Sequence, residues 1–180
     1  MISRRNRLLR AIRSLLTITR KIHVRPGRKK STMTDDGKSD IVCQMYEKDK
    51  IEFQDVEDIS PTSAQTLYAQ GGAVFIDVRT PEEQIVSMLP GAVTEQDLEN
   101  TPSILHGRTA VAYCTIGYRS GLYAADMGRQ GVRVLNIPGG ILAWVLSGGK
   151  VYHAGVETMR VHVYGEEWNY LPDGYEPVMF

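Results

Sequence analysis

Short apolar runs alternate with amphipathic stretches along the middle of the chain. Three stretches rich in β-branched and other apolar residues cover residues 73–76, 109–113 and 132–137. Short apolar runs bounded by turn signals are typical of strands that are buried on both faces of a sheet. The pattern therefore predicts three strands of a mainly parallel sheet.

Capping residues between these strands mark the starts of predicted helices. Residues 80–83 are Thr-Pro-Glu-Glu, which places threonine at the N-cap, proline at the first helical position and glutamate at the third. Glycines follow the predicted helices at their ends. The pattern predicts helices that begin near residues 61, 81, 120 and 141.

Strands that alternate with helices predict an α/β fold, in which a central, mainly parallel sheet has helices on both faces. In such sheets, ligands bind beyond the carboxyl ends of the strands. Cys114, residues 77–79 and Pro138 each follow a predicted strand. We therefore expect these three elements to share one edge of the sheet, and we expect chemistry there.

Length and composition indicate one globular domain with short appendages. The chain has 180 residues, of which 42% are hydrophobic and 23% charged, and these are ordinary values for a protein that buries a core of its own. The two cysteines, Cys43 and Cys114, belong to no metal-binding or disulfide-scaffold spacing. We expect no metal site, and no apolar run is long enough to span a membrane.

The net charge of zero conceals a strong asymmetry. Residues 1–34 contain 11 of the 21 Lys and Arg residues and no acidic residue. The remaining chain carries 10 basic against 21 acidic residues, a net charge of −11. An acidic body repels polyanions, which argues against binding of nucleic acid.

The basic segment 1–34 is amphipathic. On a helical wheel its leucines and isoleucines fall on one half and most of its arginines on the other. An arginine-rich, hydroxyl-bearing and acid-free N-terminus has the composition of an organelle transit peptide. We expect a mitochondrial destination, with a plastid as the alternative. A disordered basic tail, or a cytoplasmic protein translated from Met33, is also compatible with this composition.

Residues 35–51 are mostly polar and predict a linker between the basic segment and the folded domain. Cys43 lies in this stretch without a partner nearby in the sequence. We interpret it as an incidental cysteine, and the less favoured alternative is a resolving thiol.

Residues 113–121, YCTIGYRSG, place Cys114 directly after a strand and shortly before a helix. This arrangement binds anions because backbone N–H groups point into the loop and the helix dipole adds positive charge. A thiolate is stabilised there. Gly117 permits a loop conformation that a Cβ would resist, and Arg119 adds a fixed positive charge. From the loop alone, Cys114 is either a nucleophile or a buried residue at a strand end.

Four stretches, FIDVRTPEEQ, LPGAV, VAYCTIGYRSG and VLNIPGGILAW, follow one another in this order. Together they resemble the single-domain rhodaneses, a family of sulfurtransferases, over residues 52–153. The resemblance implies an α/β fold and a cysteine that carries sulfane sulfur as a persulfide. It assigns the persulfide to Cys114 and the cradling loop to Thr115, Ile116, Gly117, Tyr118 and Arg119. It implies no cofactor.

Loop length discriminates between sulfur transfer and phosphate chemistry. Relatives in this family that hydrolyse phosphate esters carry Cys-x5-Arg, often with a histidine before the cysteine. This chain has Cys-x4-Arg, preceded by Tyr113, and the shorter loop suits a single sulfur atom. The resemblance therefore favours a sulfurtransferase over a phosphatase or an arsenate reductase.

The implied mechanism is a double displacement. Cys114 takes the outer sulfur of a donor such as thiosulfate or a persulfide, and passes it to cyanide, a thiol or a protein. No general base is required if the attacking thiol is ionised. The alternative is a non-enzymatic rhodanese module that binds partners or senses oxidants through Cys114. We expect a monomer.

Three features depart from the commonest family pattern. Ser87-Met88 replaces Gly-His before the Pro-Gly-Ala turn, which we interpret as a structural change. Thr115 and Ile116 replace cationic loop residues, which implies weaker attraction of thiosulfate and favours a neutral or protein persulfide as donor. The bulky Ile116 and Tyr118 would narrow the pocket or dock a partner.

Asp77 and Arg79 are candidate supporting residues at a strand end. They would either position the substrate or form a buried ion pair that orders the loop, and the favoured partner of Asp77 is then Arg119. We favour the structural role. Glu82 and Glu83 are interpreted as charges at a helix N-terminus.

The remaining polar residues of the body are interpreted as structural, including the histidines His106, His153 and His162. Residues 154–180 extend beyond the resemblance and contain a strand-like alternation over 161–164. Their aromatic residues predict that this extension packs on the domain, with a partner-binding arm as the alternative.

Overall fold

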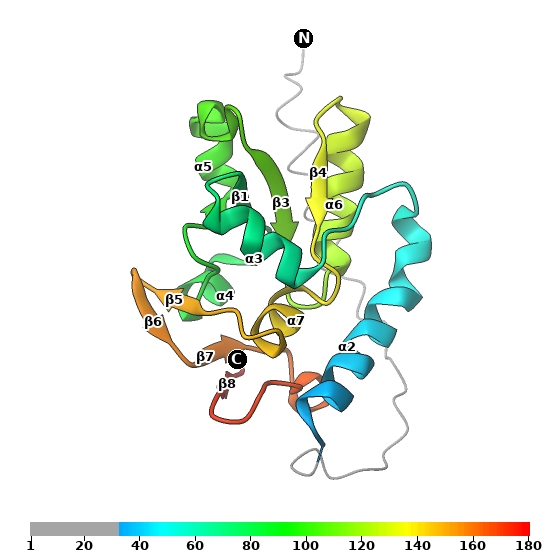
Figure 1. Cartoon of the computed structure of the whole chain (residues 1–180), viewed down its shortest axis with the longest axis vertical. Coiled ribbons are helices and arrows are strands. Elements are labelled where there is room, and N and C mark those ends of the chain that lie inside the picture. The colour runs from blue at the N-terminus through cyan, green and yellow to red at the C-terminus, as the bar shows by residue number, and fades with distance from the viewer. Residues whose placement is uncertain (1–32) are drawn as a thin grey trace.

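The computed structural model describes residues 33–180, and the expected transit peptide lies outside the described residues except for positions 33 and 34 (Figure 1). A four-stranded sheet forms the centre, with strand order β2-β1-β3-β4 and all neighbours parallel. Its strands are β1 (Ala73–Asp77), β2 (Val93–Thr94), β3 (Thr109–Tyr113) and β4 (Val134–Asn136). The three predicted strands are therefore present, and β2 was not predicted.

Side chains of the sheet alternate between two apolar layers. Phe75, Val111 and Leu135 lie in one layer, where they pack with helices α3 (Pro61–Ala69) and α7 (Gly140–Leu146). Ile76, Ala112 and Val134 face the other layer with α5 (Glu95–Asn100) and α6 (Tyr118–Arg129). Because both faces are covered, strands of continuous apolar sequence are stable here. The predicted α/β fold with helices on both faces is confirmed.

Helix α4 (Pro81–Val86) begins as its sequence predicts. The Thr80 side chain accepts a hydrogen bond from the Glu83 N–H, and the Glu83 carboxylate accepts one from the Thr80 N–H. This capping box fixes the start of α4 directly beyond the end of β1. The carboxyl edge of the sheet therefore receives a helix whose first turn is acidic.

The prediction of a linker over residues 35–51 is wrong. Helix α2 (Asp35–Asp49) and the 3₁₀ turn η2 (Lys50–Phe53) occupy this stretch, and α2 crosses the lower part of the view in Figure 1. Thr34 caps the helix, and its inner face buries Val42, Met45 and Tyr46. The few apolar positions of α2 are enough to fix it because they face α7 and the Cys114 loop rather than water.

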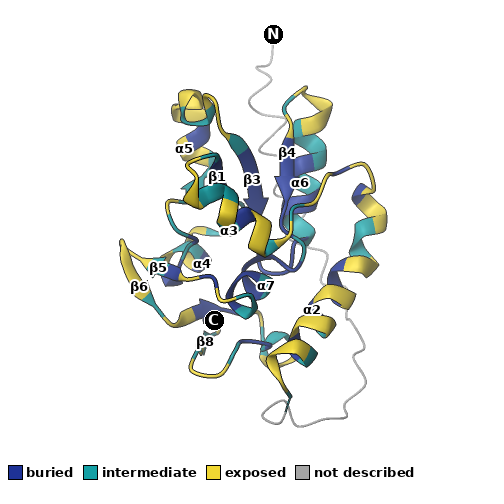
Figure 2. Cartoon of the chain, viewed as in Figure 1, coloured by how far each residue is buried: buried dark blue, intermediate teal, exposed yellow. Residues whose placement is uncertain are grey.

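The chain beyond α7 forms two small sheets. Strands β5 (Val151–His153) and β6 (Val156–Thr158) are antiparallel, whereas β7 (Arg160–His162) and β8 (Glu176–Val178) are parallel. Two further 3₁₀ turns are η3 (Pro102–Leu105) and η4 (Glu166–Trp168). Val161 and Val163 are fully buried in the core, and Figure 2 shows the buried stretch at β7 below α7. The C-terminal extension thus contributes to the same core as the sheet.

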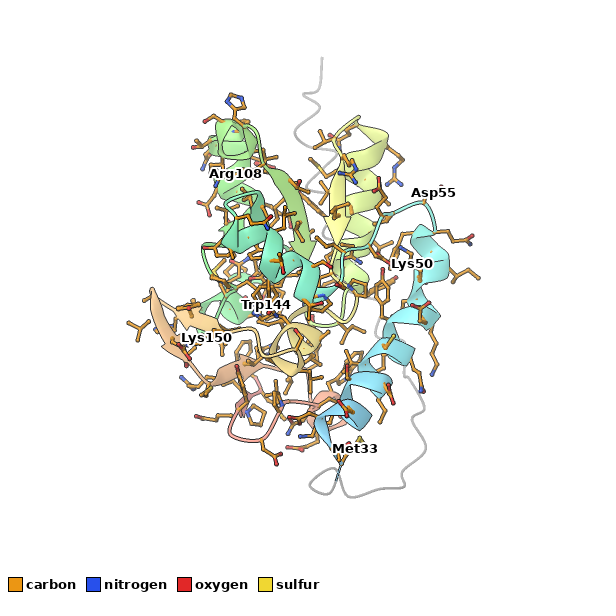
Figure 3. All side chains as sticks on the ribbon, viewed as in Figure 1. Met33, Lys50, Asp55, Arg108, Trp144 and Lys150 are labelled. Atoms are coloured by element: carbon orange, nitrogen blue, oxygen red, sulfur yellow. The ribbon has the colours of Figure 1, made fainter. Side chains whose placement is uncertain are left out.

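Trp144 lies at the centre of the molecule on α7 (Figure 3). Its ring packs edge-on against Phe75 with ring centroids 5.1 Å apart, and its indole N–H donates to the Lys150 carbonyl at 2.9 Å. Trp144 therefore has a packing role in the core. Within residues 33–180, no helix is both long and apolar enough to cross a membrane.

Candidate active site

Cys114 is the first residue beyond β3, at the carboxyl edge of the sheet. Its carbonyl accepts a hydrogen bond from the Ile141 N–H at 2.9 Å, and the Thr115 carbonyl accepts one from the Leu142 N–H at 3.3 Å. These bonds attach the loop to the first turn of α7. The loop therefore rests on two rigid elements, a central strand and a buried helix.

Gly117 brings the loop back over the cysteine. Its φ is +94°, and its N–H donates to the Cys114 Sγ at 3.2 Å. A Cβ at this position would lie 2.8 Å from the Tyr46 ring and 2.9 Å from the Ile137 carbonyl. Only glycine therefore combines this backbone conformation with this close approach. The loop leads directly into α6, whose first N–H groups have no partner within the helix.

Asn136, at the end of β4, holds the far side of this loop. Its amide Nδ2 donates to the Gly117 carbonyl at 3.0 Å and to the Tyr46 hydroxyl at 3.1 Å. Tyr46 in turn donates to Asp58 at 2.6 Å. Helix α2 is thus connected to the cysteine loop through a buried polar network. The sequence contains one signal for this role, a polar residue within the apolar run Val-Leu-Asn-Ile.

Arg119 forms a bidentate ion pair with Glu83, with nitrogen–oxygen distances of 2.7 and 2.8 Å. It also donates to the Thr115 hydroxyl at 3.2 Å. Glu83 is buried, and burial alone would raise its pKa, but the hydrogen bonds and charge of Arg119 outweigh burial and lower the pKa to about 2. Glu83 therefore does more than provide charge at a helix N-terminus. Sequence reasoning missed this partner.

Asp77 pairs with Arg79, so the expected pair of Asp77 with Arg119 is wrong. The Arg79 guanidinium donates to the two Asp77 oxygens at 2.9 and 2.7 Å, and it also donates to the Ser87 carbonyl. Tyr113 donates a further hydrogen bond to Asp77. Asp77 and Arg79 have no exposed side-chain surface. This geometry fits the buried, loop-ordering role that we favoured for the two residues.

The C-terminal extension contributes two side chains that sequence reasoning did not assign to the site. The Nδ1 atom of His162 lies 3.3 Å from a Glu83 oxygen. The Arg119 guanidinium carbon lies 5.2 Å from the centre of the Tyr164 ring. Burial lowers the pKa of His162, while the charge of Glu83 opposes this change. His162 is therefore a neutral neighbour of the ion pair at neutral pH.

The loop is almost entirely enclosed. Cys114 is 1% exposed and Ile116 is 4% exposed. Ile116 packs into the core, so it forms no exposed tip, whereas Tyr118 is partly buried and donates to Glu52 at 3.0 Å near the surface. A surface hollow between η2 and the end of α6 is separate, since Cys114 is not among its lining residues.

Replacing Glu83 with glutamine is expected to lower the free energy of unfolding by about 3 kcal/mol at pH 7, since each pKa unit corresponds to about 1.4 kcal/mol. The folded-state pKa of Glu83, about 2, lies below its ordinary value of 4.5. Its stabilising contribution is therefore present above pH 4.5 and lost as the pH falls toward 2. Urea unfolding between pH 2 and 7 measures this difference.

Glutamine keeps an acceptor for the capping hydrogen bond of Thr80 but lacks the charge. The matched control is Glu82→Gln, because Glu82 lies on the same helix turn and is exposed. We expect the control to unfold like the unchanged protein. Equal stability of the two variants at pH 7 would contradict the role assigned to the Arg119–Glu83 pair.

Comparisons with known proteins place the chain among relatives. The model of the rhodanese-like domain family matches residues 60–147. A sulfurtransferase of Allochromatium vinosum is 35% identical over 94 residues, which cover 49% of this chain and 87% of that protein. Uncharacterized protein slr1261 of Synechocystis sp. is 31% identical over 109 residues, and the match covers 57% of this chain but only 61% of that relative's length. Among solved structures, thiosulfate sulfurtransferase from Pseudomonas aeruginosa is 18% identical with a TM-score of 0.49, over 71% of this chain and 25% of that chain.

Proposed function

The chain belongs to the rhodanese-like domain family, and we propose that it is a sulfurtransferase that carries sulfane sulfur as a persulfide on Cys114. The observation that carries the proposal is the contact between the Gly117 N–H and the Cys114 Sγ at the N-terminus of α6. A backbone donor and a helix N-terminus stabilise negative charge on sulfur. The same groups would hold the charge of a persulfide.

The first half-reaction loads the enzyme. The Cys114 thiolate attacks the outer sulfur of the donor, and a new sulfur–sulfur bond forms as the bond within the donor breaks. The departing sulfite or thiolate keeps the electron pair of the broken bond. The outer sulfur on Cys114 then carries the negative charge and lies within the loop that Gly117 and Arg119 shape.

The second half-reaction removes the sulfur atom from the enzyme. A nucleophilic acceptor attacks the outer sulfur, and Cys114 leaves as a thiolate with the electron pair. Cyanide serves as an acceptor in the test tube, and a thiol, free or on a protein, fits the same chemistry and becomes a persulfide. Neither half-reaction needs a redox cofactor, because one sulfur atom moves between nucleophiles without a net change in electrons.

Charge compensation at the site supports a persulfide as the donor rather than thiosulfate. Arg119 is neutralised by Glu83, and Arg79 is neutralised by Asp77. Thr115 and Ile116 add no charge. A dianion such as thiosulfate gains little attraction from a site whose cations are already paired.

We therefore expect kcat/KM for a low-molecular-weight persulfide to exceed that for thiosulfate by about tenfold or more. Cyanide would serve as the common acceptor, and thiocyanate formation would be measured for both donors. The thiosulfate rate should change little with ionic strength. Salt slows such a reaction by screening exposed, unpaired cations that attract the anion, and the cations of this site are paired. Faster turnover with thiosulfate, together with a steep fall in added salt, would contradict the donor preference.

A further inference from the structure

Residues 160–164 approach the cysteine loop from outside the stretch that the family model matches, which ends at residue 147. Strand β7 pairs with β8, with His162 opposite Val178. Val161 and Val163 are fully buried in the core. Because side chains alternate along an extended chain, His162 and Tyr164 lie on the other face. The apolar core and strand β8 thus fix the positions of these two side chains.

His162 and Tyr164 lie beside the Arg119–Glu83 ion pair. The Tyr164 ring covers the Arg119 guanidinium at 5.2 Å, and His162 lies 3.3 Å from Glu83. Further aromatic contacts support the two residues. Tyr164 contacts Trp168 with ring centroids 5.8 Å apart, and His162 contacts Phe180 at 4.4 Å. An aromatic face over a guanidinium attracts it and restricts its movement.

The phenol of Tyr164 is uncharged beside the loop. Burial raises the pKa of Tyr164, and the charges of Glu83 and Cys114 raise it further, while the charge of Arg119 opposes these effects. The phenol therefore stays protonated at neutral pH and keeps its hydrogen-bonding capacity. The ring thus engages Arg119, the last of the five residues that follow Cys114.

We propose that Tyr164 is a positioning residue for sulfur transfer, which holds Arg119, and through Arg119 the Thr115 hydroxyl, in place around the sulfur that Cys114 carries. The inference rests on the proposed sulfurtransferase function. Without the ring, the Arg119 side chain, already 26% exposed, becomes more accessible to water, and the guanidinium gains freedom to leave the loop. Without the hydroxyl alone, the ring still covers Arg119.

The test compares Tyr164→Ala and Tyr164→Phe in the full chain. Tyr175→Ala and Tyr175→Phe are the matched controls, since Tyr175 belongs to the same extension but contacts the Gly149 carbonyl instead. Starting from protein loaded with sulfur, we expect Tyr164→Ala to transfer it to a thiol about tenfold more slowly. Tyr164→Phe should lose less, and both control variants should stay within about twofold of the unchanged protein.

A second readout separates positioning from general loosening of the fold. The pH profile of Cys114 alkylation by iodoacetamide reports on the charged and titratable groups near the loop: Arg119, Glu83, His162 and Tyr164 itself. We expect Tyr164→Ala to shift this profile in the unchanged background and to shift it much less in an Arg119→Gln background, because the effect passes through Arg119. Such non-additivity is not expected from a structural role.

The inference is overturned if Tyr164→Ala transfers sulfur as fast as Tyr175→Ala, or if its alkylation profile matches that of the unchanged protein. A shift of equal size with and without Arg119 would also overturn it. If the unchanged protein accepts no sulfur at all, the proposed function fails. The alkylation profile then decides the role of Tyr164 by itself.

Discussion

Replacing Gly140 with alanine is expected to lower the free energy of unfolding by about 4 kcal/mol or more, or to prevent folding. A Cβ at this position would lie 2.3 Å from the Cys114 carbonyl oxygen and 2.8 Å from the carbonyl carbon of Thr115. These are backbone atoms of the cysteine loop and have little freedom to move. The positive φ of Gly140, +53°, adds a further cost for alanine.

Gly148→Ala provides the matched control. Gly148 also has a positive φ, +80°, but a Cβ there would meet nothing within 4 Å. This control should lose only about 1 kcal/mol, the cost of the backbone conformation itself. Urea unfolding of both variants separates steric overlap from backbone strain. Equal losses would contradict the close packing of α7 against the loop.

Replacing Cys114 with serine is expected to reduce sulfur transfer at least about 10³-fold. A serine hydroxyl has nearly the same size but is not ionised near neutral pH and forms no persulfide. The change removes the carrier and leaves the loop intact. Steady-state thiocyanate formation from a persulfide donor and cyanide measures the effect.

Cys43→Ser is the control for this experiment, because Cys43 is exposed on α2 and has no role in the proposed reaction. The control should retain the activity of the unchanged protein. Substantial transfer by Cys114→Ser would show that the sulfur travels on another group. A loss in Cys43→Ser would point to Cys43 as a second sulfur carrier.

The central sheet was predictable because its signal is local. The runs around Phe75 and Val111 are almost wholly apolar, and the run around Leu135 is mostly apolar, as is typical of strands between two helical layers. The start of α4 was equally clear from Thr80 to Glu83, since its capping box uses four consecutive residues. Strand β2 escaped prediction because two residues carry no periodicity.

Helix α2 was missed for a different reason. Most of its residues are polar, and its N-cap, Thr34, follows a basic stretch. This composition indicated a linker rather than a helix. What stabilises α2 is tertiary: Val42 packs in the core, and Tyr46 lies against Gly117. A few apolar contacts with distant residues outweighed a weak local pattern.

The cysteine loop could be predicted because Cys114, Gly117 and Arg119 lie within one short stretch of the sequence. The partners of these three residues could not be predicted from the sequence. Glu83 and Asn136 reach the loop from other strands and helices, and Tyr164 reaches it from the C-terminal extension. Each of these contacts depends on the packing of segments far apart in the chain. Glu83 has an ordinary local explanation as part of a helix cap, and the only signal for Asn136 is its polarity within an apolar run.

The most direct test of the account is the intact mass of the full chain after incubation with a low-molecular-weight persulfide or thiosulfate and removal of the donor by gel filtration. We predict a gain of one sulfur atom, about 32 Da, that requires Cys114 and is retained in Cys43→Ser. The gain should disappear on addition of cyanide. If neither donor adds mass to Cys114, the sulfurtransferase proposal is contradicted, and a rhodanese-like module that binds partners or senses oxidants becomes the better account.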